Sequence, residues 1–227
     1  MNGWLERVFP LFGQGGMELL DGSHIVVVGL GGVGGYAAEA ICRAGVGRIT
    51  LVDGDVYETG NLNRQLCADT QTIGRNKAAV TAERIARINP GCRTEAVAKM
   101  LSGDNCAEII GFPSFVCDCC DDTDAKVEIA KYCVKNGIPV ISCMGTGNRL
   151  FPEKLKTADI SKTSVCPLAR TMRKKLREAG INHIPVVFSD EIPSVRSVPP
   201  SSVSFVPGVA GLMMAGYVIR KITGKEQ

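Results

Sequence analysis

The feature that most constrains this 227-residue chain is a glycine-rich turn between a predicted strand and a predicted helix. Residues 24–29 form a short, mostly β-branched run, which is typical of a strand buried on both faces of a parallel sheet. Apolar side chains then recur at helical spacing from Val33 to Ala44. In this context the pattern G-x-G-x-x-G lets the backbone approach a phosphate at the N-terminus of the helix. We expect the turn to bind the phosphates of a nucleotide through Gly29, Gly31, Gly32 and Gly34.

The rest of the chain alternates between the strand and helix periodicities. Strands are predicted at 48–53, 93–98, 114–119, 138–143 and 185–189, and helices at 75–89, 123–136 and 165–179. This alternation predicts an α/β fold, a doubly wound, mostly parallel sheet of the Rossmann type with helices on both faces. Residues 190–202 are rich in proline and serine and are expected to form a mobile loop. A closing strand and a closing helix are expected after that loop.

Length and composition are those of one large globular domain. The 45% of apolar and 22% of charged residues exclude a disordered chain. The net charge of +3 is too small to indicate nucleic-acid binding, but residues 149–188 hold nine Lys or Arg against three Asp or Glu. We expect residues 1–227 to form a single domain. Within it, 1–148 is the predicted nucleotide-binding core, and 149–227 a substrate-facing extension that ends in the closing strand and helix.

The ten cysteines suggest metal or redox chemistry, but their spacing favours a structural role. The first residues lack the pattern of a signal peptide, so we expect the reducing cytoplasm, where disulfides are rare. Cys117 and Cys120 form one C-x-x-C pair, and because no second pair occurs, no structural zinc is expected. The apolar stretch 203–219 is interrupted by proline and glycine and falls short of the roughly 20 residues of a membrane span. A buried or interface helix is expected there, with a membrane-touching tail as the alternative.

Polar residues follow several predicted strands. Asp53 ends the second strand, where a carboxylate can accept hydrogen bonds from a ribose. The run 61–65, Lys77 and the run 118–122 should meet at the same sheet edge, because parallel strands end together there. Cations neutralise charge on a leaving pyrophosphate, and a carboxylate holds Mg²⁺. The turn alone would also suit NAD, but hydride transfer needs neither group, so the set favours phosphoryl or nucleotidyl transfer.

In order and spacing, these motifs resemble the adenylation domain of the ubiquitin-activating-enzyme superfamily, over about residues 5–150. The resemblance implies ATP and Mg²⁺ as cofactors. It implies that Asp53 binds the ribose, and that Asn61 and Arg64 contact the triphosphate with Lys77 beside them. It also implies that Asp121 holds Mg²⁺ through ATP. The catalytic candidates are therefore Arg64, Lys77 and Asp121.

Further nucleotide-binding candidates in the same motifs are Asp55, Asn63 and Asp122. Arg7 resembles the amino-terminal arginine that reaches the nucleotide of the partner subunit in dimers of this superfamily. That likeness implies a homodimer.

The second half of the chain distinguishes between branches of the superfamily. Sulfur-carrier adenylyltransferases usually carry two zinc-binding C-x-x-C pairs there, and this chain has none. The segments 142–148, 162–179 and 184–189 instead resemble the tRNA threonylcarbamoyladenosine dehydratases, so that the resemblance covers nearly the whole chain. Members of that family activate the threonyl carboxylate of a modified adenosine next to the anticodon. AMP then leaves as an internal attack closes a five-membered ring, a net ATP-dependent loss of water.

The basic stretch supports a tRNA partner independently, because Lys and Arg bind backbone phosphates. The tRNA-binding candidates are Arg149, Lys162, Arg170, Arg173, Lys174 and Arg177. An ordinary solvated helix face is the competing interpretation of these charges. Cys166 is the cysteine best placed for a covalent role, but cyclisation needs no thioester. Two other functions stay open: activation of a small sulfur-carrier protein ending in Gly-Gly, and a nucleotide-binding scaffold without turnover. A sulfur-transfer protein is a further candidate partner.

Overall fold

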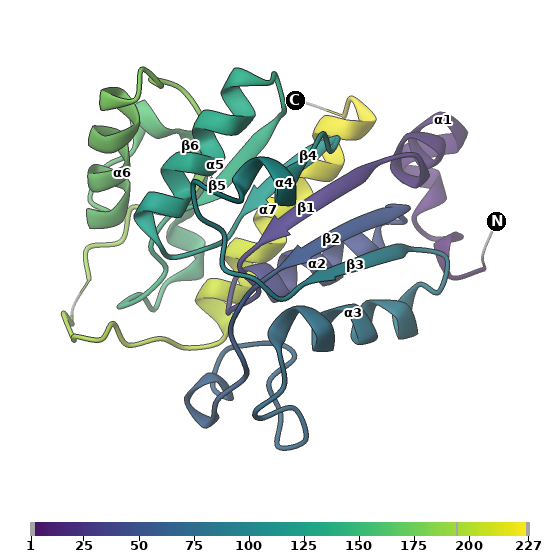
Figure 1. The fold of residues 1–227 in the computed structure, drawn as a ribbon, viewed down its shortest axis with the longest axis horizontal. Helices are drawn as coiled ribbons and strands as arrows, with labels where there is room; N and C mark the ends of the chain where they lie inside the picture. Colours follow the sequence, from purple (N-terminus) through teal and green to yellow (C-terminus); the bar gives the residue numbers. More distant parts are fainter. Residues whose placement is uncertain (1–2, 194, 226–227) are drawn as a thin grey trace.

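A computed structural model of the chain describes residues 3–193 and 195–225. In these ranges seven strands form one sheet in the order β3-β2-β1-β4-β5-β7-β6, parallel except for β6 (Figure 1). The strands are β1 His24–Val28, β2 Arg48–Val52, β3 Arg93–Val97, β4 Phe115–Asp118, β5 Val140–Cys143, β6 Leu155–Asp159 and β7 Pro185–Ser189. The predicted doubly wound α/β fold is confirmed. The strand order reverses direction between β1 and β4, where such folds bind ligands.

Helices cover both faces of the sheet, as predicted. One face carries α1 Phe9–Asp21, α2 Gly34–Arg43, α3 Lys77–Ile88 and α7 Phe205–Thr223. The other carries α4 Cys106–Ile110, α5 Thr123–Lys135 and α6 Pro167–Glu178. Short 3₁₀ turns occupy η1 Gly3–Leu5, η2 Thr59–Asn61, η3 Pro152–Lys154 and η4 Ile160–Lys162.

Alternation along β1 shows why the sheet needs both helix layers. Ile25 and Val27 pack into the cluster beneath α1, α2 and α7, whereas Val26 and Val28 pack into the cluster beneath α4, α5 and α6. All four side chains are buried. A strand with two apolar faces is stable only when both are covered.

The predicted closing strand is wrong. The described residues after the 190–202 loop pass directly into α7. The strand that pairs with β7 at the edge of the sheet is β6, which precedes α6 in the chain and runs antiparallel to β7. β6 lies at the sheet edge and is only partly buried, so its sequence lacks the apolar run that marked the inner strands. The helices α1 and α4 were also not predicted.

The apolar segment near the C-terminus forms the expected core helix, α7. It is long and apolar enough to span a membrane by length and composition, but half of that stretch is buried inside the fold. A Cβ at Gly211 would overlap the carbonyl oxygen of Val33 at the start of α2. Glycine therefore permits the close approach of α7 to α2.

The 190–202 segment is a loop, as predicted, although Ser194 lies outside the described residues. The described part is hydrogen-bonded to the segment that follows β5. Asn148 Oδ1 accepts from the backbone N–H of Ser201 and from the hydroxyl of Ser197, at 2.8 Å each. This loop and residues 145–149 therefore lie together over the sheet edge.

A buried ion pair joins the carboxyl ends of β4 and β5. The Lys126 ammonium, on α5, lies 3.0 Å from the Asp118 carboxylate and also donates to the Ser142 hydroxyl and the Cys143 carbonyl. Ser142 Oγ donates to the same carboxylate at 2.5 Å. Burial opposes the charge on Lys126, but the Asp118 carboxylate raises its pKa above the ordinary value. This pair holds the start of the 118–122 run.

Replacing Lys126 with Met should destabilise the fold by about 3–5 kcal/mol, because it leaves the Asp118 carboxylate buried without its partner. The double variant Lys126→Met/Asp118→Asn should recover part of that loss. Lys135→Met changes an exposed lysine on the same helix and should stay within about 0.5 kcal/mol of the parent chain. Urea unfolding at pH 7 measures all three. A Lys126→Met variant as stable as the Lys135→Met control would show that the pair does not stabilise the sheet edge.

Candidate active site

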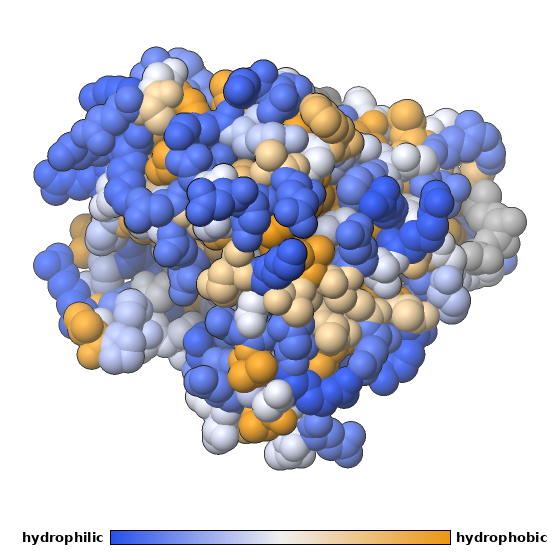
Figure 2. Space-filling view, in the orientation of Figure 1, coloured by the Kyte–Doolittle hydropathy of each residue, from blue (hydrophilic) through white to orange (hydrophobic). Residues whose placement is uncertain are grey.

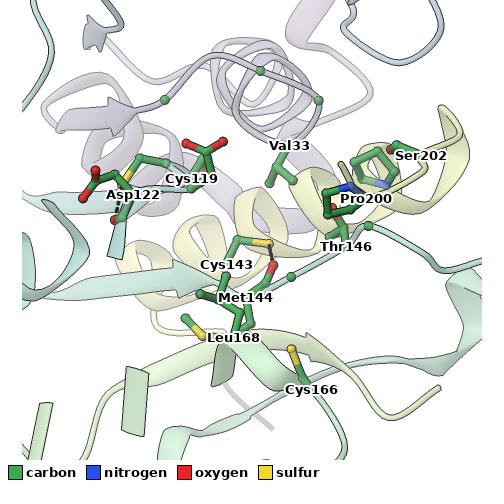
Figure 3. Close-up of a pocket in the computed structure, with 18 of the residues that line it drawn as sticks. Val33, Cys119, Asp122, Cys143, Met144, Thr146, Cys166, Leu168, Pro200 and Ser202 are labelled. Atoms are coloured by element: carbon green, nitrogen blue, oxygen red, sulfur yellow. Dashed lines mark hydrogen bonds between the residues drawn. The ribbon is translucent and has the colours of Figure 1, made fainter. Parts of the chain in front are cut away.

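A cavity of about 1170 Å³ opens at the carboxyl edge of the sheet (Figure 3). Its walls come from the glycine turn, the ends of β2, β4 and β5, the start of α6, and the 190–202 loop. In Figure 3, Cys119 and Asp122 lie on one side, Cys166 and Leu168 on another, and Pro200 and Ser202 on a third. Ligand pockets usually span about 300–1,000 Å³. This cavity therefore has room for a nucleotide and part of a second substrate.

The predicted glycine turn lines one wall. Gly29 has a φ of 84°, a conformation that favours glycine. A Cβ at Gly34 would overlap the carbonyl oxygen of Gly29, so the turn closes only with glycine at this position. Gly31 and Gly32 face the cavity, and α2 begins there with no side-chain cap. Uncapped backbone N–H groups at the start of a helix are suited to phosphate binding.

Asp53 is held in place by the turn itself. Its Oδ2 accepts from the backbone N–H of Leu30 at 2.7 Å, and its Oδ1 accepts from the backbone N–H of Asp55 at 2.9 Å. The side chain is almost buried but lines the cavity. Each carboxylate oxygen has a second acceptor site, so a ribose hydroxyl can still bind. The bond to Leu30 was not predicted.

The two predicted cations of the nucleotide end come together in the cavity wall. Lys77 is almost buried and its Nζ lies 3.0 Å from Asp55 Oδ2. Arg64 donates to the Gly60 carbonyl and to Asn63 Oδ1, at 2.9 Å each. Both side chains line the cavity. Two positive charges beside an anion-binding turn suit a polyphosphate.

Two of the predicted nucleotide ligands lie outside the cavity wall. Asn61 Oδ1 accepts from the backbone N–H of Glu58, completing a capping box around η2. Asn63 Nδ2 donates to the Ser202 carbonyl at 2.9 Å, which joins this segment to the loop. In the present geometry the Asn63 side chain positions Arg64, whereas the Asn61 side chain caps η2.

The acidic run divides into two roles. Asp122 caps α5, and its Oδ1 accepts from the backbone N–H groups of Ala125 and Asp124 at 2.8 Å each. These bonds lower the pKa of Asp122. Asp121 is exposed at the cavity wall. Among the described residues no cluster of three His, Cys, Asp or Glu could bind a metal, so Asp121 fits Mg²⁺ only together with phosphate oxygens and water, which is a common Mg²⁺ arrangement.

Arg7 lies away from this cavity. Neighbouring Leu5 packs close to Gly45, which precedes β2 and so lies at the amino edge of the sheet. Arg7 is exposed there. Arg7 is therefore not part of the wall of this cavity.

The predicted tRNA-binding residues divide by burial. Arg170, Lys174 and Arg177 are exposed on α6, and Lys162 is exposed on η4, in a region that is hydrophilic in Figure 2. Arg173 is half-buried and donates to the Thr163 carbonyl and hydroxyl, at 2.7 and 2.8 Å.

Arg149 is the buried member of this set: it is only 4% exposed and lines the cavity, which Arg170 and Arg173 also line. The basic stretch is therefore not one continuous surface.

Comparisons with known proteins agree with this geometry. The sequence matches the ThiF family over residues 5–227. The chain belongs to the ThiF family. It is similar to the tRNA threonylcarbamoyladenosine dehydratase of Bacillus subtilis, with 40% identity over 91% of this chain and 89% of the relative.

A crystal structure of E. coli tRNA N6-threonylcarbamoyladenosine dehydratase in complex with ATP has a TM-score of 0.92 and 33% identity, covering 99% of this chain and 97% of that one. The E. coli sulfur carrier protein ThiS adenylyltransferase is 35% identical, but over only 61% of this chain and 55% of its own length. The sequence likeness to the Bacillus subtilis dehydratase thus covers nine tenths of the chain, and the likeness to this adenylyltransferase covers less than two thirds of it.

Two groups of cavity residues were not assigned from the sequence. Gln65 is buried, and its Oε1 has no hydrogen-bond partner among the described residues. It belongs to the polar run 61–65, which was the available signal. Residues 144–148 line the cavity just after β5. Gly145 and Gly147 marked a turn at a carboxyl strand end, where ligands bind in such folds.

The cysteines are free thiols, and most are buried. Burial raises the pKa of Cys117 and Cys119, and raises that of Cys143 to about 12. A thiol with such a pKa is protonated at neutral pH and is a poor nucleophile. These three cysteines therefore have a packing role, as predicted for most of the ten.

Iodoacetamide should leave Cys117 and Cys143 unmodified in the native protein at pH 7.5. A pKa of about 12 for Cys143, against 9.0 for an unperturbed thiol, lowers its thiolate fraction about a thousandfold, and burial also blocks access. Both cysteines should react fully in urea. Peptide mass spectrometry of time points measures each site, with a small-molecule thiol as the rate standard. Native labelling of Cys143 as fast as that standard would contradict the assignment.

Proposed function

We propose that this chain is an ATP-dependent tRNA threonylcarbamoyladenosine dehydratase, which activates the threonyl carboxylate of its substrate by adenylation. One observation carries the choice within the superfamily. The likeness covers 91% of the chain for the Bacillus subtilis dehydratase and 99% for the E. coli dehydratase structure, whereas the sulfur-carrier adenylyltransferase matches 61%. The cavity with its glycine turn and paired cations supplies the adenylation chemistry.

In this proposal the nucleotide end of the cavity binds ATP. The turn around Gly31 and Gly32 binds phosphate oxygens, and Asp53 accepts from the ribose. Lys77 and Arg64 neutralise the charge that develops as pyrophosphate leaves. Asp121 holds Mg²⁺, which supplies further neutralisation of the phosphates when bound. These preorganised charges let one anion, the substrate carboxylate, approach another, the α-phosphate.

The second step needs little from the chain. The carboxylate oxygen bonded to the α-phosphorus leaves with AMP when an internal nucleophile of the substrate attacks the carbonyl carbon. The ring closes with net loss of one water from the nucleoside. Cys166 lines the cavity, but this route forms no thioester, so we assign it no covalent role.

The partners follow from the same proposal. The exposed stripe of Arg170, Lys174 and Arg177 binds the tRNA backbone, with Lys162 beside it. A homodimer would bring Arg7 of one subunit to the nucleotide of the other. The protein would act in the cytoplasm, with a sulfur-transfer protein as a further candidate partner.

The decisive assay incubates the protein with ATP, Mg²⁺ and tRNA bearing threonylcarbamoyladenosine, followed by nucleoside mass spectrometry. The parent chain should remove one water from that nucleoside. Asp121→Asn and Arg64→Ala should each lower the rate by about a hundredfold, because each removes a charge that stabilises the transition state by on the order of 3 kcal/mol. Arg87→Gln, an exposed arginine on α3 outside the cavity, is the control and should not change the rate.

Three outcomes would reject the proposal or its residue assignments. No mass loss with the parent chain would reject the dehydratase. ATP–pyrophosphate exchange stimulated by a carrier protein ending in Gly-Gly, and not by tRNA, would favour the sulfur-carrier alternative. ATP consumption unchanged in both cavity variants would indicate that Arg64 does not neutralise the leaving pyrophosphate and that Asp121 does not hold Mg²⁺.

Changing the exposed stripe should weaken tRNA binding without changing ATP binding. In the triple variant Arg170→Gln/Lys174→Gln/Arg177→Gln, the slope of log K against log salt should fall by about 2, at roughly 0.7–0.9 per lost phosphate contact. Fluorescence anisotropy at several salt concentrations measures the slope.

The matched control removes three exposed charges elsewhere, in Arg87→Gln/Arg93→Gln/Lys225→Gln. An equal loss in both triple variants would mean that the effect is one of net charge, and that α6 is an ordinary solvated face.

A further inference from the structure

Arg149 is a buried cation without a partner among the described residues. It follows β5, is 4% exposed and lines the cavity. Its Nε is buried with no hydrogen-bond partner, and its guanidinium makes no ion pair with any residue that the structure describes. Guanidinium stays protonated in proteins, so this is a fixed positive charge removed from water.

Two other buried cations of the fold are compensated. Lys126 is paired with Asp118, and Lys77 with Asp55. The buried acid next to the Arg149 segment is Glu191, but its carboxylate accepts from the backbone N–H groups of the two residues after Arg149, at 3.0–3.1 Å. Burying an unpaired charge is costly unless a ligand supplies the counter-charge. The position of Arg149 in a cavity wall therefore points to an anionic ligand.

The surroundings of Arg149 favour the same conclusion. Arg170, Arg173 and Arg196 line the cavity with it, and α6 begins there with an N-cap residue, Cys166, that makes no side-chain cap. The carboxylates that line the cavity belong to the segments after β2 and β4 instead: they are Asp53, Asp55, Asp121 and Asp122. Among the described residues, the side chains that line the nucleotide end therefore include both carboxylates and cations. The charged side chains that line the cavity near the start of α6 are arginines.

The segment that carries Arg149 is held firmly. A Cβ at Gly145 would lie 3.7 Å from Cys166 Sγ, and one at Gly147 would lie 2.7 Å from the Pro200 ring. Asn148 is hydrogen-bonded to the loop on the same side. Arg149 thus extends from a segment packed between α6 and the 190–202 loop, which fixes the backbone position from which its side chain reaches the cavity wall.

We propose that Arg149 binds the free carboxylate of the acyl substrate before adenylation, and so selects tRNA that carries the modified nucleoside. This inference rests on the proposed function. The phosphates of ATP already have the glycine turn, Lys77 and Arg64, and the tRNA backbone has the exposed stripe on α6. A planar guanidinium matches a carboxylate with two parallel hydrogen bonds. Adenylation and ring closure abolish the carboxylate charge, so the product loses this contact.

The test compares binding of three tRNAs in the absence of ATP: tRNA with threonylcarbamoyladenosine, the same tRNA after cyclisation, and tRNA with unmodified adenosine. The parent chain should prefer the first by about 10- to 100-fold, the range expected for hydrogen bonds to a charged group. Arg149→Gln should abolish the preference, with affinity for the other two tRNAs and for ATP unchanged. Arg149→Lys, which keeps the charge but not the paired geometry, should retain part of it.

Arg87→Gln is the control and should keep the full preference. Equal weakening of all three tRNAs by Arg149→Gln would assign Arg149 to the tRNA backbone, and a loss of ATP affinity would assign it to a phosphate. Either result overturns the proposal. A parent chain that binds all three tRNAs equally would also overturn the proposal. That result requires no variant, so it can be obtained even if Arg149→Gln fails to fold. In each case, dehydration of the nucleoside by the parent chain tests the proposed function separately.

Discussion

The close approach of Gly34 to the carbonyl oxygen of Gly29 is the contact on which the rest of the structure depends. It closes the turn after β1 tightly enough for α2 to begin against the sheet edge. The helix α7 packs closely on the start of α2, since Gly211 lies against the carbonyl oxygen of Val33. The same turn holds Asp53 through the N–H of Leu30. One backbone constraint thus orients the glycine turn, the Asp53 carboxylate and the C-terminal helix.

The cavity that results has two chemically different ends. At the turn, cations and carboxylates alternate, which suits a polyphosphate with a divalent metal. At α6, the lining charges of the described residues are arginines. Adenylation of a carboxylate brings two anions into contact, and the repulsion between them must be offset by fixed positive charge on both sides. A site with cations at only one end would bind ATP but would not draw in the second anion.

Local patterns predicted the elements and residues that depend on nearby sequence. The β-branched strands, the glycine turn, Asp53 and Lys77 all follow from periodicity and spacing, because strand ends in this fold share one edge. β6 was missed because an edge strand needs no continuous apolar run. Lys126 was missed because its role depends on Asp118 and Ser142, which reach it only through the packing of α5 on β4 and β5. Such pairings are tertiary, and no spacing encodes them.

The basic stretch shows how burial changes the meaning of a charge count. By sequence, its nine cations form one group that suits a polyanion. In the fold, Lys175 pairs with Asp124 at 2.6 Å and Arg173 is tied to Thr163, so neither is freely available. Arg149 is buried in the cavity wall, whereas Lys174 and Arg177 are exposed outside the cavity. Arg170 is exposed but also lines the cavity. Water and salt screen the charge of an exposed cation, which suits the distributed negative charge of a nucleic-acid backbone. A buried cation can instead distinguish a ligand that carries one anionic group from a ligand that lacks it. In the proposed function, recognition of the tRNA backbone and recognition of its modified base would therefore rest on different members of one basic segment.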